Sequence, residues 1–284
     1  MSTTRRRFLG VAAAMGGGWL TSLSVRGQGA PGKQASYGGQ PMGIQSYSLR
    51  HLDLDSALDV VRELGLHHVE LYGAHLSPTA TGPEIDLVLE KLRRRDIALS
   101  AHGVNRFGPS HAENRSLFEF ADRAGIRNLS ADPQPDDATF SSLDRLVDEF
   151  GVRIAIHNHG PGSRWDTPET ILAALEGRHP GIGVCADLGH FLRSEVDPVE
   201  ALRAFEGRLY GVHLKDFAER RKETRGVVLG EGHLDLVGVF SALRDVGFPA
   251  DGALSLEYEE PDPLEAIRRC LEAASEAAQR AATA

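Results

Sequence analysis

Four runs decide the fold: RIAIHNH (153–159), GVCADLGH (183–190), LYGVHLKD (209–216) and ALSLEYEE (253–260). Side chains alternate between the two faces of a β-strand. In the first run, Ile154 and Ile156 therefore share one face, while Ala155 and His157 share the other. Each run has small residues on one face and a group that can bind a metal near its end. This pattern is typical of a parallel barrel with helices outside and a polar site at the carboxyl ends of its strands.

The rest of the chain alternates strand-like and helix-like segments. Eight strands are predicted, at residues 43–48, 67–72, 97–103, 128–132, 153–159, 182–187, 209–215 and 253–258. Eight helices are predicted, at residues 55–64, 83–95, 110–124, 139–150, 167–176, 198–205, 236–246 and 263–279. Such alternation indicates parallel strands joined by right-handed crossovers. The sequence also lacks a nucleotide-binding glycine motif after the first strand. The alternation and this lack together favour a closed (β/α)8 barrel over an open sheet.

The first 30 residues have the features of an export signal. Arg5 and Arg6 precede Phe8 and Leu9, and a weakly apolar stretch rich in glycine and alanine follows. A charged start, a short apolar region and small residues at the end are typical of a secretory signal. The paired arginines resemble a twin-arginine signal, which addresses a protein to the periplasm or the exterior. An ordinary secretory signal is the alternative, and the stretch is short for a stable membrane span.

The expected domain organisation follows. Residues 1–30 form the signal, residues 31–41 a flexible mature N-terminus, and residues 42–284 a single barrel domain. Beyond residue 30 the chain has 27 basic and 40 acidic residues, a net charge of −13. That balance argues against a general binder of nucleic acid or anionic membranes. The two cysteines, Cys185 and Cys270, make no disulfide framework.

Metal-ligand side chains end four successive strands. His157, Asp187, His213 and Glu257 are all predicted to face the barrel interior at one height. Taken singly, such a residue is usually a hydrogen-bonded loop group, but four together favour a metal site. Two imidazoles and two carboxylates suit one Mn²⁺, Zn²⁺, Co²⁺ or Fe²⁺ better than Ca²⁺. Four further residues could contact substrate, support the ligands or bind metal. They are Glu70, His102, His159 and His190.

Several short motifs carry a resemblance to a known family. They are HNH at 157–159, ADLGH at 186–190, GVHLKD at 211–216, LGEGHLDL at 229–236 and LSLEYE at 254–259. With these motifs the chain resembles the xylose isomerase-like TIM-barrel superfamily, over about residues 41–275. That superfamily includes sugar-phosphate isomerases and epimerases, inosose-processing enzymes and metal-dependent abasic-site endonucleases. The motifs are specific for the superfamily but do not name a substrate.

The resemblance implies roles for individual residues. Asp187, His213 and Glu257 match metal ligands, and His190 matches a position that binds metal or substrate. His102 stands where the endonucleases have another histidine ligand, and Lys215 and Asp216 complete a motif that usually lines the sugar site. His157 departs from the glutamate of ketose epimerases, so a mechanism with two glutamates is in doubt. The HNH variant indicates the branch of inosose dehydratases and keto-sugar lyases.

The expected activity is metal-dependent carbohydrate or polyol chemistry. A metal-bound ketone acidifies the adjacent C–H, and a base forms an enediolate that either reprotonates or expels a β-substituent. The expected catalytic residues are Glu257, Glu70 and His102, and the expected substrate contacts are His159, His190 and Lys215.

Two other functions stay open. One is an exported sugar-binding barrel without catalysis, and the other is an abasic-site endonuclease. His157 and the acidic net charge count against the endonuclease. A homo-oligomer is also left open.

Overall fold

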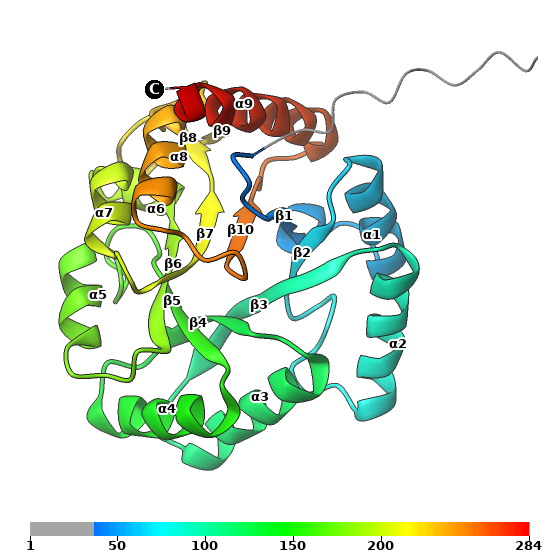
Figure 1. Ribbon diagram of the computed structural model, residues 1–284, viewed down its shortest axis with the longest axis vertical. Helices are drawn as coiled ribbons and strands as arrows, with labels where there is room; N and C mark the ends of the chain where they lie inside the picture. Colours follow the sequence, from blue (N-terminus) through cyan, green and yellow to red (C-terminus); the bar gives the residue numbers. More distant parts are fainter. Residues whose placement is uncertain (1–36, 284) are drawn as a thin grey trace, which may run out of the picture. The chain divides into compact units, whose positions relative to one another are not determined.

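A computed structural model describes residues 37–283. Eight parallel strands close into a barrel in the order β1-β10-β7-β6-β5-β4-β3-β2 (Figure 1). The barrel strands are β1 (Met42–Gln45), β2 (His68–Leu71), β3 (Ala98–Phe107), β4 (Asn128–Pro133), β5 (Arg153–His157), β6 (Ile182–Asp187), β7 (Leu209–Leu214) and β10 (Ala253–Leu256). The predicted (β/α)8 barrel is therefore confirmed. The expected export signal lies outside the described residues.

Helices surround the strands on all sides in Figure 1. They are η1 (Ser46–Leu49), α1 (Leu54–Glu63), α2 (Gly82–Arg94), α3 (His111–Ala124), α4 (Asp137–Phe150), α5 (Pro168–Leu175), α6 (Leu188–Arg193), α7 (Pro198–Ala204), α8 (Leu236–Asp245) and α9 (Pro263–Thr283). Each of the eight predicted helices is present within a few residues of its expected ends. None of the helices in residues 37–283 has the length and apolar character that crossing a membrane requires.

Local signals begin and end these helices as the sequence predicts. Asp53 Oδ1 accepts a hydrogen bond from Ser56 N–H at 2.8 Å at the start of α1. Such a cap stabilises a helix by about 1 kcal/mol. Gly151 ends α4 with a φ of 66°, a left-handed conformation that costs glycine little. These signals set where each crossover returns to the barrel.

Small residues fill the barrel interior because neighbouring strands converge there. Cys185 on β6 pairs with Gly211 on β7, and both are buried. A Cβ atom at Gly211 would lie 2.8 Å from Cys185 Sγ, closer than van der Waals contact permits. The large apolar residues, such as Ile154 and Ile156, instead pack in the layer between strands and helices. The interior therefore leaves its space for polar groups at the carboxyl ends of the strands.

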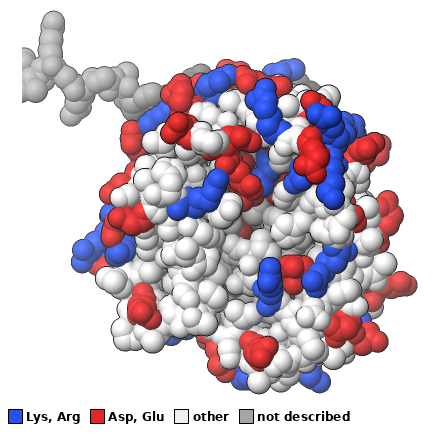
Figure 2. All heavy atoms as spheres, turned by 180° about the vertical axis from the view of Figure 1, so that it is seen from behind, with Lys and Arg blue, Asp and Glu red and all other residues white. Residues whose placement is uncertain are grey.

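Two segments outside the predicted strands and helices contain regular structure. The six-residue helix α6 follows β6 directly, with Asp187 as its N-cap. The polar loop after β7 contains an antiparallel hairpin of β8 (Asp216–Phe217) and β9 (Gly226–Val227). Figure 2 shows the face opposite to Figure 1, which is hollowed near its centre and carries interspersed basic and acidic side chains. Helix α6 and the β8–β9 hairpin both help to build the candidate site.

Candidate active site

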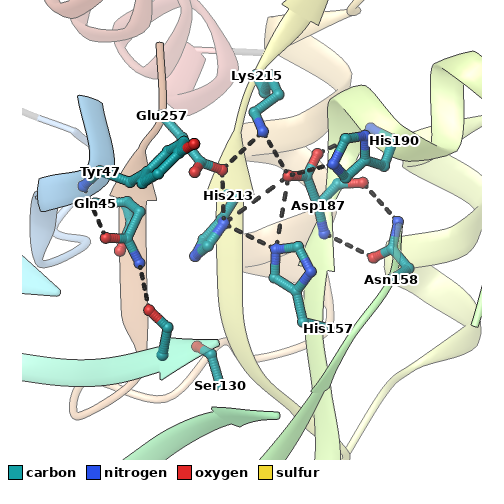
Figure 3. A network of polar contacts seen from close by, with 12 residues as sticks. Gln45, Tyr47, Ser130, His157, Asn158, Asp187, His190, His213, Lys215 and Glu257 are labelled. Atoms are coloured by element: carbon teal, nitrogen blue, oxygen red, sulfur yellow. Dashed lines mark hydrogen bonds and ion pairs between the residues drawn. The ribbon is translucent and has the colours of Figure 1, made fainter. Parts of the chain in front are cut away.

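Four metal-ligand side chains converge where β5, β6, β7 and β10 end (Figure 3). Strand register explains this, because Asp187 pairs with His213 and His213 pairs with Ser255, two residues before Glu257. His157 Nε2 lies 3.1 Å from His213 Nδ1, which lies 3.1 Å from Glu257 Oε2. One ligand atom from each of the four residues falls within 4.8 Å of the others, and all four residues are buried.

Asp187 supplies the oxygen best placed for a metal. Its Oδ1 accepts a hydrogen bond from His190 N–H at 2.8 Å and so caps α6. Its buried Oδ2 accepts no hydrogen bond, although it forms an ion pair with Lys215 Nζ at 3.2 Å and lies 3.7 Å from His157 Nε2 and 3.9 Å from His213 Nδ1. The ion pair with Lys215 offsets part of the cost of burying this oxygen, and a bound cation would supply the direct contact that hydrogen bonds do not. This oxygen and the mixed nitrogen and oxygen donors fit a divalent transition metal.

Asn158 holds the ends of two ligand-bearing strands together. Its side-chain amide donates to the Asp187 carbonyl at 2.9 Å, and its Oδ1 accepts from Asp187 N–H at 2.8 Å. Asn158 is fully buried. It lies between the two histidines of the HNH run, and the sequence carries no separate signal for its role. The amide keeps His157 and Asp187 next to one another.

Glu70 lies behind His213, away from the cavity. Its Oε2 is 2.9 Å from His213 Nε2 and 2.8 Å from Ser255 Oγ, and its Oε1 is 2.5 Å from Ser130 Oγ. Burial raises the pKa of this carboxyl, but His213 and the two serines outweigh burial and lower it. Glu70 therefore remains ionised. Its place favours support of a ligand over the expected role of a catalytic base.

His102 faces away from the site, in contrast to its expected orientation. A β-bulge shifts the β2–β3 register between Val69 and Glu70, so His102 pairs with Leu71 rather than following Glu70 inward. A one-residue shift moves a side chain to the other face of the sheet. His102 Nε2 contacts the Leu76 carbonyl at 2.9 Å, and its ring packs edge-on against Phe120 of α3. It does not line the cavity.

A cavity of about 430 Å³ opens beside the four candidate ligands. His159, His190 and Lys215, the expected substrate contacts, all line it. The structure therefore brings these three together with His157, His213 and Glu257 around one space. The volume is within the range of small-molecule sites.

Lys215 carries a positive charge in this cavity. Its Nζ lies 2.7 Å from Glu259 Oε1, 2.8 Å from Glu257 Oε2 and 3.2 Å from Asp187 Oδ2. Burial lowers the pKa of Lys215, but the three carboxylates outweigh burial and raise it. Burial likewise raises the pKa of Glu257, and the charges of Lys215 and His213 lower it to well below its usual value. Both groups are therefore ionised near neutral pH.

Two of the histidines that line the cavity, His159 and His190, are neutral near neutral pH. Burial lowers the pKa of His190 to about 4, although the charge of Asp187 opposes this change. Burial also lowers the pKa of His159. Their rings lie 5.7 Å apart between centroids, and His190 is stacked on Phe217 of β8. Neutral imidazoles at this position can accept a proton.

The opposite wall of the cavity was not predicted from the sequence. It includes Gln45, Tyr47 and Tyr72, which follow or end β1 and β2. The Tyr47 and Tyr72 rings meet edge to face at 5.4 Å between centroids. Aromatic rings beside polar groups suit the apolar faces and hydroxyls of a sugar. The only sequence signal for them is their position at strand ends.

Comparisons with known proteins agree with this architecture. Residues 58–277 match the family described as xylose isomerase-like TIM barrel. A 134-residue stretch is 31% identical to inosose dehydratase from Geobacillus kaustophilus and covers 42% of each protein. The chain thus spans less than half the length of that curated relative.

Solved structures with a similar fold match over more of the chain. An uncharacterized protein from Parabacteroides distasonis is 29% identical, with a TM-score of 0.64 over 82% of this chain and 97% of that one. A D-tagatose 3-epimerase-like protein is 19% identical, with a TM-score of 0.69 over 86% of this chain and 99% of that one, and shares the fold. The family expected from the sequence motifs is confirmed: the chain belongs to the xylose isomerase-like TIM barrel family.

Proposed function

We propose that the protein is a metal-dependent enzyme that acts next to a carbonyl of a carbohydrate or polyol. One observation carries the proposal: four ligand atoms converge beside a polar cavity, and one of them, Asp187 Oδ2, is buried without a hydrogen bond. His157, Asp187, His213 and Glu257 would hold the ion. When bound, a divalent metal polarises a carbonyl and acidifies the adjacent C–H.

The cavity residues supply the proton chemistry. A carboxylate at Glu257, or a neutral imidazole at His159 or His190, can accept the proton from carbon. Lys215 remains protonated and can donate hydrogen bonds to substrate oxygens or hold the carboxylates apart. Loss of the proton leaves an enediolate, which either regains a proton or expels a β-substituent as the C–O bond breaks.

Elimination is the outcome that we favour. A two-carboxylate epimerase needs carboxylates on opposite faces of the sugar, whereas Glu257 and Glu259 both follow β10 and lie on one side of the cavity. Glu70, across the barrel on β2, is buried behind His213. The similarity to proteins named inosose dehydratase supports the same choice. We therefore propose a dehydratase or lyase, with isomerisation as the alternative.

A metal-reconstitution assay tests this function. The protein is stripped with a chelator, reloaded separately with Mn²⁺, Co²⁺, Zn²⁺ or Fe²⁺, and incubated with inosose and keto-sugars in D₂O. Deuterium incorporation next to the carbonyl reports enediolate formation, and ultraviolet absorption of a conjugated enone reports elimination. Turnover should vanish on chelation and return on reloading. Sugar binding without exchange or elimination under any metal would indicate a non-catalytic binding protein.

We also propose that residues 1–30 direct export. The support is the sequence pattern of Arg5 and Arg6 followed by Phe8 and Leu9. A folded-protein export route would let the chain bind its metal before it leaves the cytoplasm.

A further inference from the structure

A second, smaller cavity adjoins the candidate active site. Its volume is about 190 Å³. It shares four lining residues with the first cavity, namely His190, Lys215, Glu257 and Glu259. The two cavities therefore adjoin at the Lys215 ion pairs with Glu257 and Glu259.

The β8–β9 hairpin forms the outer wall of this second cavity. Phe217, Thr224 and Gly226 of the hairpin region all line it. Arg193 at the end of α6 donates two hydrogen bonds to the Lys222 carbonyl, at 3.0 and 2.9 Å. Gly226 N–H donates to Glu260 Oε1 at 2.6 Å. The hairpin is thus attached to two elements that carry site residues, so the cavity is a built feature of this face.

The charges around the second cavity argue against an anionic ligand. Two cations line it, Arg193 and Lys215, and both are already engaged by other groups. Four carboxylates also line it, from Asp216, Glu257, Glu259 and Glu260. A phosphate or carboxylate group would meet net negative charge there. The Asp216 carboxylate already accepts backbone N–H groups, but a neutral ligand with many hydroxyls could donate to Glu259 and Glu260 and pack against the Phe217 ring.

We propose that the second cavity binds a neutral glycosyl or polyol unit, attached to the unit whose carbonyl lies at the metal ligands. The substrate class is then a keto-glycoside or keto-disaccharide rather than a free keto-sugar or a sugar phosphate. The small volume suits a single ring. This inference rests on the proposed function and adds the size and charge of the substrate.

Binding measurements on the Mn²⁺-loaded protein test the proposal. Calorimetric Kd values are compared for D-fructose, the keto-disaccharide lactulose and fructose 6-phosphate. Lactulose should bind roughly tenfold more tightly than fructose because its second ring buries additional surface. Fructose 6-phosphate should bind no better than fructose. Equal Kd values for lactulose and fructose would overturn this inference alone, as would tightest binding of the phosphate.

A substitution that fills the second cavity tests whether the second ring of lactulose binds there. Thr224→Trp adds an indole to the cavity wall and should remove the advantage of lactulose while the fructose Kd stays within about twofold. Glu223→Trp adds the same bulk at an exposed hairpin position and should change neither value. An unchanged lactulose advantage in Thr224→Trp would place the second ring elsewhere and contradict the proposal. If a protein that holds Mn²⁺ binds none of the three sugars, the proposed carbohydrate function fails as well.

Discussion

Glu70 Oε2 lies 2.9 Å from His213 Nε2, while the other ring nitrogen of His213 faces Glu257 Oε2 at 3.1 Å. The His213 imidazole therefore contacts the buried Glu70 carboxylate through one nitrogen and faces the cluster of candidate ligands through the other. A carboxylate that accepts the second N–H of a metal-binding histidine fixes its tautomer and orientation and strengthens its donor nitrogen. Glu70 would therefore support a metal held by His213, and it does not line the cavity.

Substitution of Glu70 should weaken metal binding without removing a ligand. Glu70→Gln keeps an acceptor for His213 and should lose about tenfold in metal affinity, whereas Glu70→Leu should lose about a hundredfold. Competition with a chelating dye gives the Kd, and the Co²⁺ absorption spectrum reports the ligand geometry. Glu63→Gln, at an exposed position of α1, is the control. Unchanged affinity and spectrum in Glu70→Leu would show that His213 needs no such partner.

Asp187 should show separate effects on metal binding and on stability. Asp187→Asn and Asp187→Ala should both lose most bound metal, since each lacks the negatively charged oxygen that faces His157 and His213. Asn can still cap α6, so the alanine variant should be less stable by about 1 kcal/mol. Elemental analysis and urea unfolding measure the two effects. Full metal occupancy in both variants would exclude Asp187 as a ligand.

Glu257 should be needed for turnover beyond its part in metal binding. Glu257→Gln should retain part of the metal through its amide oxygen, yet turnover should fall by at least about a hundredfold because a proton acceptor is lost. Deuterium exchange into bound substrate measures the proton step directly. Glu265→Gln, at an exposed position of α9, is the control. Exchange at the wild-type rate in Glu257→Gln would transfer the role of base to His159 or His190.

The metal-free protein should lose stability as the pH falls below about 6.5. Burial holds the pKa of His190 at about 4 in the folded chain, below its value of about 6.5 in the unfolded chain. The unfolded chain therefore binds more protons between these values, and protonation favours unfolding. The expected loss from His190 is up to about 3 kcal/mol between pH 6.5 and 4.

His190→Gln isolates this contribution. Urea unfolding of the chelated protein at several pH values should give a flatter decline for the variant than for the wild type. Parallel declines in the two proteins would mean that His190 is protonated in the folded chain as readily as in the unfolded chain.

Replacement of the paired arginines should stop export. Arg5→Lys combined with Arg6→Lys should leave the protein in the cytoplasm, because twin-arginine recognition depends on that pair. Cell fractionation followed by immunoblotting measures the distribution, and Arg26→Lys is the control within the same segment. Unchanged export of the double variant through a route for unfolded chains would show an ordinary secretory signal.

The sequence alone determined the barrel and the four candidate metal ligands. Alternating strands such as RIAIHNH bury large side chains on one face and leave small ones on the other, while the intervening segments have the period and caps of helices. Parallel strands in a closed barrel bring their carboxyl ends to one rim. The convergence of His157, Asp187, His213 and Glu257 therefore followed from their positions along their own strands.

Only the tertiary structure decided how the remaining polar residues are used. The β2–β3 bulge turns His102 toward Phe120, and the pairing of His213 with Glu70 joins residues 143 positions apart. The β8–β9 hairpin and its attachment to Arg193 create the second cavity. Local periodicity sets which face a side chain takes within an ideal strand. Register shifts and contacts between distant segments depend on the packing of the whole chain, so they become defined only when the barrel closes.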